Sequence, residues 1–189
     1  MRTYIKITTI ICTLFVIAGC QQFSEKETDQ SAGLNGGFEI AKNDLPVNWL
    51  MYTPNTVPDA EFEIVLDKTV FKEGLQSLKF DVKSCSSKGG WGSPGFTNEF
   101  FDAGKFEGEG TYRLSFWLKN DGASFRVIAG NVAAKDGDMR TVVQSDEQLE
   151  EWKYYEFTID VPEERHLRME LNVLSPGSLW VDDVQVVKI

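Results

Sequence analysis

Histidine and cysteine are scarce in this chain of 189 residues, which has one histidine and three cysteines. Cys12 lies in an apolar N-terminal segment and Cys20 follows that segment directly, so Cys85 stands alone in the remainder. The remainder therefore has no partner for an internal disulfide, and one thiol with one imidazole, that of His166, disfavours a four-ligand zinc site. A catalytic triad is disfavoured as well, because His166 follows Glu163-Glu164-Arg165 in a predicted turn, where a surface histidine is expected.

Positive charge is also in short supply. The chain has 19 basic and 29 acidic residues, a formal net charge of −10. Residues 1–19 contain Arg2 and Lys6 but no acid, so the remainder has 17 basic against 29 acidic residues and a formal charge of −12. Nucleic acid is thus an unsuitable partner, because its binding needs basic patches that replace phosphate counterions. Docking on anionic lipid through protein charge is disfavoured for the same reason.

No apolar run is long enough to span a bilayer, which takes ~20 residues. The longest, from Ile7 to Ala18, follows Arg2 and Lys6 in the charged-then-apolar order of a secretory signal. It ends in Ile17-Ala18-Gly19-Cys20, which resembles the bacterial lipobox, where the cysteine is acylated and becomes the first mature residue. We therefore expect a signal peptide over residues 1–19 and a lipid on Cys20; a short transmembrane anchor is the alternative.

The segment after Cys20 is polar and poor in bulky apolar residues. We expect residues 20–34 to form a flexible tether between the lipid and a folded domain over residues 35–189. Gln21-Gln22 contains no aspartate of the kind that retains lipoproteins at an inner membrane. The expected location is the bacterial envelope, at the outer membrane or the cell surface.

The remainder reads as short strands separated by Gly, Asn, Asp and Pro. Apolar residues occupy every second position in five stretches: 62–66, 78–82, 112–118, 155–161 and 167–173. Asn120-Asp121-Gly122 predicts a turn, with residues 124–129 as a possible hairpin partner of the strand before it. Strands that recur in this way predict an all-β fold, an antiparallel two-sheet sandwich or jelly roll.

The last predicted strand, residues 179–187, contains two adjacent carboxylates, Asp182 and Asp183. Side chains alternate along a strand, so these two are expected on opposite faces. One of them then faces inward or lies at an edge, where an unpaired carboxylate is costly. A cation shared with Glu39 would remove that cost.

Six stretches together resemble carbohydrate-binding modules with a galactose-binding-like jelly roll. They occur in the order found in those modules: Asn35-Gly36-Gly37-Phe38-Glu39, Pro46-Val47-Asn48-Trp49, residues 74–80, residues 112–119, Trp152-Lys153-Tyr154-Tyr155, and residues 179–184. The resemblance covers residues 35–189. The Gly- and Ser-rich segment 84–99 departs from the pattern of these modules.

This resemblance implies a sugar-binding sandwich with a structural calcium near the meeting of its first and last strands. The ligands carried over are Glu39 and Asp182, with Asp183 as the substitute. Calcium takes roughly 6–8 oxygen ligands, so backbone carbonyls would supply most of the shell. The alternative is that Glu39 pairs with a lysine and Asp182 caps a turn through hydrogen bonds.

Two places have the aromatic side chains and hydrogen-bonding groups that a pyranose needs. The first is the polar face of the central strands, where Trp117 accompanies Arg113, with Arg126 and the row Arg168, Glu170 and Asn172 as possible neighbours. The alternative for Trp117 is burial under a loop. The arginines would then form cross-strand ion pairs.

The second place is the Gly-rich loop, which presents Trp91 and Phe96 on a backbone that glycine allows to approach a ligand. The alternative is that Trp91 closes one end of the sandwich as a small satellite core. Trp49, Trp152 and Trp180 are expected to be structural.

The leading hypothesis is therefore a non-catalytic lipoprotein that binds a polysaccharide or oligosaccharide at the envelope. One alternative is a structural or adhesive scaffold for envelope proteins. Another is a sandwich-fold glycoside hydrolase or polysaccharide lyase, for which the candidate set is Arg113, Arg126 and Arg168 with Tyr154.

Overall fold

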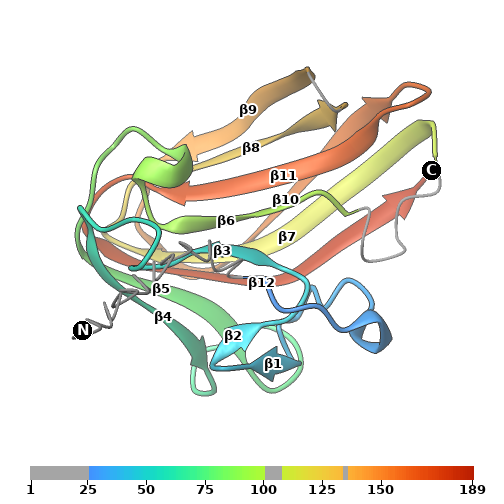
Figure 1. Ribbon diagram of the computed structural model, residues 1–189. Coiled ribbons are helices and arrows are strands. Elements are labelled where there is room, and N and C mark those ends of the chain that lie inside the picture. The colour runs from blue at the N-terminus through green and yellow to red at the C-terminus, as the bar shows by residue number, and fades with distance from the viewer. Residues whose placement is uncertain (1–25, 101–107, 134–135) are drawn as a thin grey trace, which may run out of the picture.

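The computed structural model describes residues 26–100, 108–133 and 136–189, and these form a sandwich of two five-stranded sheets (Figure 1). The first sheet has the order β10-β7-β12-β5-β4 and the second the order β3-β6-β11-β8-β9. Every neighbouring pair is antiparallel. The predicted antiparallel β-sandwich is thus confirmed.

The strand bounds follow the alternation in the sequence. The first sheet consists of β4 (Glu61–Asp67), β5 (Ser77–Ser84), β7 (Gly110–Asp121), β10 (Leu149–Val161) and β12 (Gly177–Lys188). The second consists of β3 (Leu50–Tyr52), β6 (Gly95–Asn98), β8 (Phe125–Val132), β9 (Gly137–Ser145) and β11 (His166–Val173). A small ribbon of β1 (Ala41–Lys42) and β2 (Leu45–Pro46) and two 3-10 turns, η1 (Gln30–Ala32) and η2 (Gly90–Gly92), complete the described elements.

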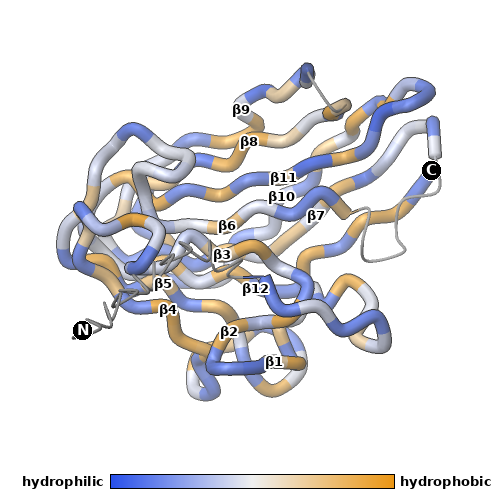
Figure 2. The backbone as a smooth tube through the Cα atoms, in the orientation of Figure 1, coloured by the Kyte–Doolittle hydropathy of each residue, from blue (hydrophilic) through white to orange (hydrophobic). Residues whose placement is uncertain are grey.

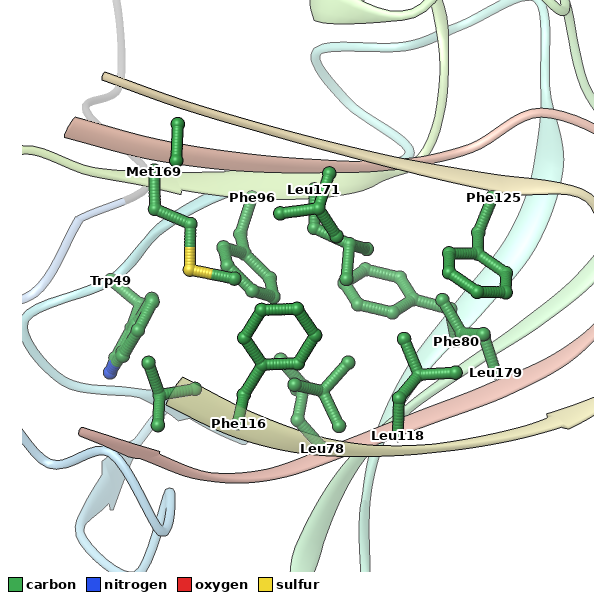
Figure 3. Close-up of a cluster of buried hydrophobic side chains, with 14 of the residues drawn as sticks. Trp49, Leu78, Phe80, Phe96, Phe116, Leu118, Phe125, Met169, Leu171 and Leu179 are labelled. Atoms are coloured by element: carbon green, nitrogen blue, oxygen red, sulfur yellow. The ribbon is translucent and has the colours of Figure 1, made fainter. Parts of the chain in front are cut away.

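The core lies between the two sheets. Figure 2 shows hydrophobic and hydrophilic segments alternating along the strands, and Figure 3 shows the inward set, with Phe116, Leu118 and Leu78 of the first sheet facing Phe96 and Leu171 of the second. All five are fully buried. Burying aromatic and aliphatic side chains on this scale stabilises each by roughly 1.5–3 kcal/mol, which makes this layer the main support of the fold.

The turn at Asn120-Asp121-Gly122 does not close the predicted hairpin. β7 pairs with β10 and β12, whereas β8, which follows the turn, pairs with β9 and β11 in the other sheet. The Asn120 side chain donates to the carbonyls of Ala123 and Glu147, both at 2.8 Å. The turn therefore carries the chain from one sheet to the other.

The folded part starts before residue 35, so the predicted tether of residues 20–34 is wrong for its described portion. The backbone N–H of Asn48 donates to the carbonyl of Glu27 at 2.7 Å, and the Asn48 side chain donates to the carbonyls of Asp29 and Gly33. Leu34 is 7% exposed and belongs to the core. Polar composition suggested a tether because these contacts use backbone groups, which composition does not record. Among the described residues, no helix is long and apolar enough to cross a membrane.

The prediction for the Asp182–Asp183 pair is also corrected. β12 has a bulge between Asp182 and Gln185, and Asp183 has a positive φ of 48°. Asp182 pairs with Trp117 and points away from the core, while Val181 and Val184 are buried within it. Because the bulge adds one residue to β12, Val184 rather than Asp183 points into the core, and neither carboxylate enters it.

Candidate functional site

The two outer surfaces of the sandwich differ, and each sheet supplies one of them. We call the outer surface of β3-β6-β11-β8-β9 the β11 face and that of β10-β7-β12-β5-β4 the β12 face. Along β11, Leu167, Met169, Leu171 and Val173 enter the core. The alternate residues, His166, Arg168, Glu170 and Asn172, therefore belong to the β11 face.

An aromatic pair stands at one end of the β11 face. Tyr52 lies at the end of β3, and the indole of Trp91, from the turn η2, packs against its ring with 4.5 Å between centroids and 45° between planes. Trp91 is 53% exposed, whereas Tyr52 is 1% exposed. The pair therefore forms a wall whose outer surface, the indole, is open to a ligand.

The wall is held by a network beneath the Gly-rich loop. The Asn172 side-chain oxygen accepts hydrogen bonds from the backbone N–H of Gly90 and from Arg126 Nη2, both at 3.1 Å. Gly89 has a positive φ of 76°, and a Cβ there would lie 1.9 Å from Arg126 Nη2. Ser93 ties the loop further, because its hydroxyl accepts from Gly89 N–H at 2.9 Å and donates to the carbonyl of Ser86. The loop thus needs glycine where it crosses Arg126, and this places Trp91.

The floor beside the wall carries fixed charges. Arg168 Nη2 lies 3.3 Å from Glu170 Oε2, and Arg168 Nε donates to the Thr97 hydroxyl at 3.1 Å. Glu170 is 6% exposed, so its carboxylate is held in one place. Burial raises the pKa of the Tyr52 phenol well above its ordinary value, and the charge of Glu170 adds to that shift. Tyr52 is therefore a neutral hydrogen-bonding group next to an ion pair.

These features match the two needs of sugar binding. An aromatic face accepts the apolar C–H side of a pyranose, and fixed charged or amide groups beside it accept or donate to hydroxyls. On the β11 face, Trp91 supplies the aromatic face, and Arg168 with Glu170 supplies the fixed charged groups. All three are set by backbone pairing or loop contacts before a ligand arrives, which lowers the entropy cost of binding.

The predicted site residues divide between three places. Arg126, Asn172 and Trp91 come together at the β11 face, although Asn172 is fully buried and acts by holding the loop. Trp117 and Arg113 lie on β7 and belong to the β12 face, so the structure corrects their predicted proximity to Arg126 and Asn172.

Phe96 belongs to neither face, and its predicted exposure on the Gly-rich loop is wrong. It is fully buried in β6, and its ring centroid lies 4.9 Å from that of Trp49 (Figure 3). The ring centroid of Phe38 is 6.4 Å away. Its neighbour Gly95 lies against the backbone of Leu171, which brings β6 close to β11. The Gly-rich segment ends at this strand, and alternation then turns Phe96 inward.

Tyr52 is the site residue that sequence reasoning missed. β3 has three residues, too few for an alternation pattern, and its neighbour Trp49 was assigned to packing. Trp49 is indeed fully buried. Tyr52 becomes part of the site only because β3 pairs with β6, where Tyr52 is opposite Gly95.

The predicted calcium ligands meet under the loop of residues 68–76. Asp182 Oδ2 accepts from the backbone N–H groups of Lys72 (2.7 Å) and Glu73 (3.0 Å), and its Oδ1 accepts from Asp183 N–H at 2.7 Å. Glu39 Oε1 accepts from Leu75 N–H at 2.8 Å. Burial raises the pKa of Asp182, and the three N–H donors oppose that shift.

This carboxylate pair has some of the features of a cation site. Glu39 Oε1 lies 3.9 Å and Asp182 Oδ1 4.0 Å from the same point, the position of a Cβ on Gly37, so both carboxylates flank Gly37. Within the described residues, however, no group of three or more His, Cys, Asp or Glu side chains could hold a metal. Two carboxylates fit calcium only when backbone carbonyls complete the shell. The Asp183 side chain accepts a hydrogen bond through its Oδ1 from Gln185 Nε2, at 2.8 Å.

This fold is similar to that of proteins of known structure. No protein-family model and no curated protein matches the sequence. Among solved structures, the CBM22-1 xylan-binding domain of Xyn10C from Paenibacillus barcinonensis is similar, with a TM-score of 0.56 and 13% identity over 82% of this chain and 92% of that one.

Two further structures of the same kind are similar. The CBM22-2 xylan-binding domain of the same Xyn10C has a TM-score of 0.54 and 16% identity, over 75% of this chain and 92% of that one. The C-terminal family 22 carbohydrate-binding module of Clostridium thermocellum Xyn10B has a TM-score of 0.55 and 12% identity, over 81% and 91%. At these identities the similarity establishes the fold, a jelly-roll sandwich of the carbohydrate-binding-module type.

Proposed function

We propose that this chain is a non-catalytic glycan-binding protein and that the β11 face is its binding site. The observation that carries the proposal is the exposed indole of Trp91, fixed on Tyr52 beside the Arg168–Glu170 ion pair. A pyranose ring stacked on Trp91 has its hydroxyls within the region of these charged groups. Glu170 then acts as a hydrogen-bond acceptor and Arg168 as a donor.

The fold supports the same class of ligand. The similar structures named above are described as xylan-binding or carbohydrate-binding modules. Xylan is therefore the first polysaccharide to test, followed by a broad panel of plant and microbial glycans.

The proposal also includes a cellular location and a bound ion, and both are inferred from the sequence. A lipid on Cys20 would hold the protein at the outer membrane or cell surface, with the glycan as the partner on the far side. Calcium, bound by Glu39 and Asp182 together with backbone carbonyls, would fix the 68–76 loop against β12. It would act at a distance from the β11 face and hence as a structural ion.

The test is binding of residues 21–189, which include every described residue, to a glycan array and to polysaccharides in affinity electrophoresis. We expect retention of at least one polysaccharide, a loss of affinity of about tenfold or more in Trp91→Ala, and no change in Trp117→Ala. Trp117 is the matched control, because it is also a tryptophan of an outer face but is partly buried, with Lys72 Nζ 4.1 Å from its ring centroid and the Tyr154 ring at 5.1 Å.

Three outcomes would contradict the proposal. Loss of binding in Trp117→Ala alone would move the site to the β12 face. A folded protein that retains no glycan would favour the scaffold alternative, to be pursued by pull-down from envelope extracts. Release of reducing ends or unsaturated products from the panel would establish an enzyme.

A further inference from the structure

The β11 face continues beyond the Arg168–Glu170 pair into a hollow that the aromatic wall does not reach. The hollow has a volume of about 500 Å³, and its lining includes Glu99, Val132, Met139, His166 and Arg168. Arg168 therefore touches both regions, since its guanidinium also pairs with Glu170 beside the wall. The wall and the hollow are two parts of one strip.

One position of the sheet beside the hollow has no side chain. In the register of the second sheet, Gly130 of β8 lies between Arg168 of β11 and Met139 of β9. All three positions belong to the β11 face, and the middle one has no side chain. A Cβ at Gly130 would lie 1.9 Å from the backbone oxygen of Asp138, so β8 and β9 pack closely here only with glycine.

The strip is long compared with one sugar ring. Asn172, under the loop that carries Trp91, and His166, in the hollow, are six positions apart on β11. At about 3.3 Å per residue, the two ends are separated by roughly 20 Å. That length accommodates several sugar units in an extended chain.

The two ends differ in chemistry. The wall offers an aromatic surface, whereas the hollow has polar groups of both kinds, with His166 Nε2 3.5 Å from Glu99 Oε2. The Glu99 side chain is 53% exposed and the His166 side chain 25% exposed. The His166 Nε2 atom itself is buried, so the Glu99 carboxylate is the more accessible of the two groups. Met139 and Val132 add an apolar lining. The hollow thus suits a sugar held by its hydroxyls rather than by stacking.

We propose that the hollow is a second sugar subsite of the β11 face and that the preferred ligand is an extended chain of several units spanning from Trp91 to His166. This inference rests on the proposed function, because it assumes that the wall binds one sugar. It adds a size requirement: a disaccharide on the wall leaves the hollow empty, and a longer chain fills both.

The test is a calorimetric titration of residues 21–189 with oligosaccharides of the retained polysaccharide, from the disaccharide to the hexasaccharide; for xylan these are xylobiose to xylohexaose. We expect the dissociation constant to fall by tenfold or more along the series. His166→Ala should raise the value for the hexasaccharide by about tenfold and leave that for the disaccharide unchanged. Glu99→Ala, at a more exposed side chain, is the second variant in case His166→Ala folds poorly.

The control is Arg113→Ala on the β12 face, which should bind both ligands as the wild type does. Equal affinity for short and long chains, or an equal loss for both in His166→Ala and Glu99→Ala, would overturn the subsite and leave the proposed function intact. Binding at no chain length would contradict the proposed function itself, and the subsite with it.

Discussion

The two outer faces of this sandwich carry similar residue types but use them differently. On the β12 face, Lys72 Nζ lies 4.1 Å above the ring of Trp117, Lys79 Nζ 5.0 Å from the ring of Trp180, and Trp180 Nε1 donates to Asp67 at 2.9 Å. Each tryptophan there already has a partner from the protein.

On the β11 face, by contrast, the indole of Trp91 packs on Tyr52 and remains 53% exposed. The arginine beside it is held by Glu170 and Thr97 in a fixed position. The difference arises from the loops. Asp182 holds the 68–76 loop on the β12 face. The Gly-rich loop is held by Asn172 at one end of the β11 face and leaves the strip beyond it open.

The largest expected effect tests whether the β12 face is structural. Asp182→Ala removes the acceptor of three backbone N–H groups, those of Lys72, Glu73 and Asp183, at a fully buried position. We expect the free energy of unfolding to fall by about 3 kcal/mol or more, measured by urea denaturation.

Glycan affinity of the folded fraction should be unchanged in that variant, because Asp182 does not touch the β11 face. The Asp182→Ala variant also tests whether the protein binds calcium. Added calcium should raise the unfolding midpoint of the wild type and chelator should lower it, with no response in Asp182→Ala. A wild type that ignores both reagents would rule out calcium, and a loss of binding in the folded variant would break the distinction between the faces.

A smaller effect is expected where the Gly-rich loop crosses Arg126. Gly89→Ala combines a positive φ of 76° with a Cβ 1.9 Å from Arg126 Nη2. We expect a loss of stability of about 1–2 kcal/mol from the backbone and a several-fold loss of glycan affinity, because the displaced loop carries Trp91.

Gly122→Ala is the matched control. Gly122 has nearly the same φ, 79°, but a Cβ there meets nothing within 4 Å. It should therefore show the backbone cost without the loss of affinity. Equal affinities in the two variants would show that the position of Trp91 does not depend on this network.

The smallest effect is a pH dependence on the β12 face. Burial tends to raise the pKa of Asp67, but hydrogen bonds from Trp180, Thr69 and Val70 outweigh it and lower the value to about 2, from 3.8. Because the folded pKa lies below the unfolded one, Asp67 stabilises the fold above about pH 4, and this contribution is lost as the pH falls through about 2.

Thermal unfolding of the wild type and Asp67→Asn across this range measures the contribution. The gap between their midpoints should be constant at neutral pH and should narrow from about pH 4 toward pH 2. A gap that does not change with pH would show that the Trp180–Asp67 contact does not depend on the charge of Asp67.

Much of the fold was predictable because it depends on local patterns. Alternation identified the inward residues of β5, β7 and β11, and their burial follows from it. The order of the strands within the sheets was less accessible. The turn after β7 reads as a hairpin by composition, yet it crosses between sheets because β7 already has β10 and β12 on its two sides.

The candidate site was only partly predictable. Trp91, Arg126 and Asn172 were identified as candidates from residue type, but Trp117 and Arg113 were placed with them in error. Alternation tells which residues of one strand share a face; it does not tell which strands share a sheet. Tyr52 and Arg168, more than a hundred positions apart in the sequence, become neighbours only through the pairing of β3 with β6 and of β6 with β11.

The sequence by itself determined the all-β sandwich, the inward side of β4, β5, β7, β10 and β11, and the presence of aromatic and charged groups outside the core. It did so because the two-residue period of a strand is a local property of the backbone. Only the tertiary structure decided what each tryptophan of the outer faces contacts. Lys72 reaches Trp117, and Asn172 holds the Trp91 loop, through contacts between segments that are distant in the chain. Such contacts depend on the register and order of the strands, which no local pattern specifies.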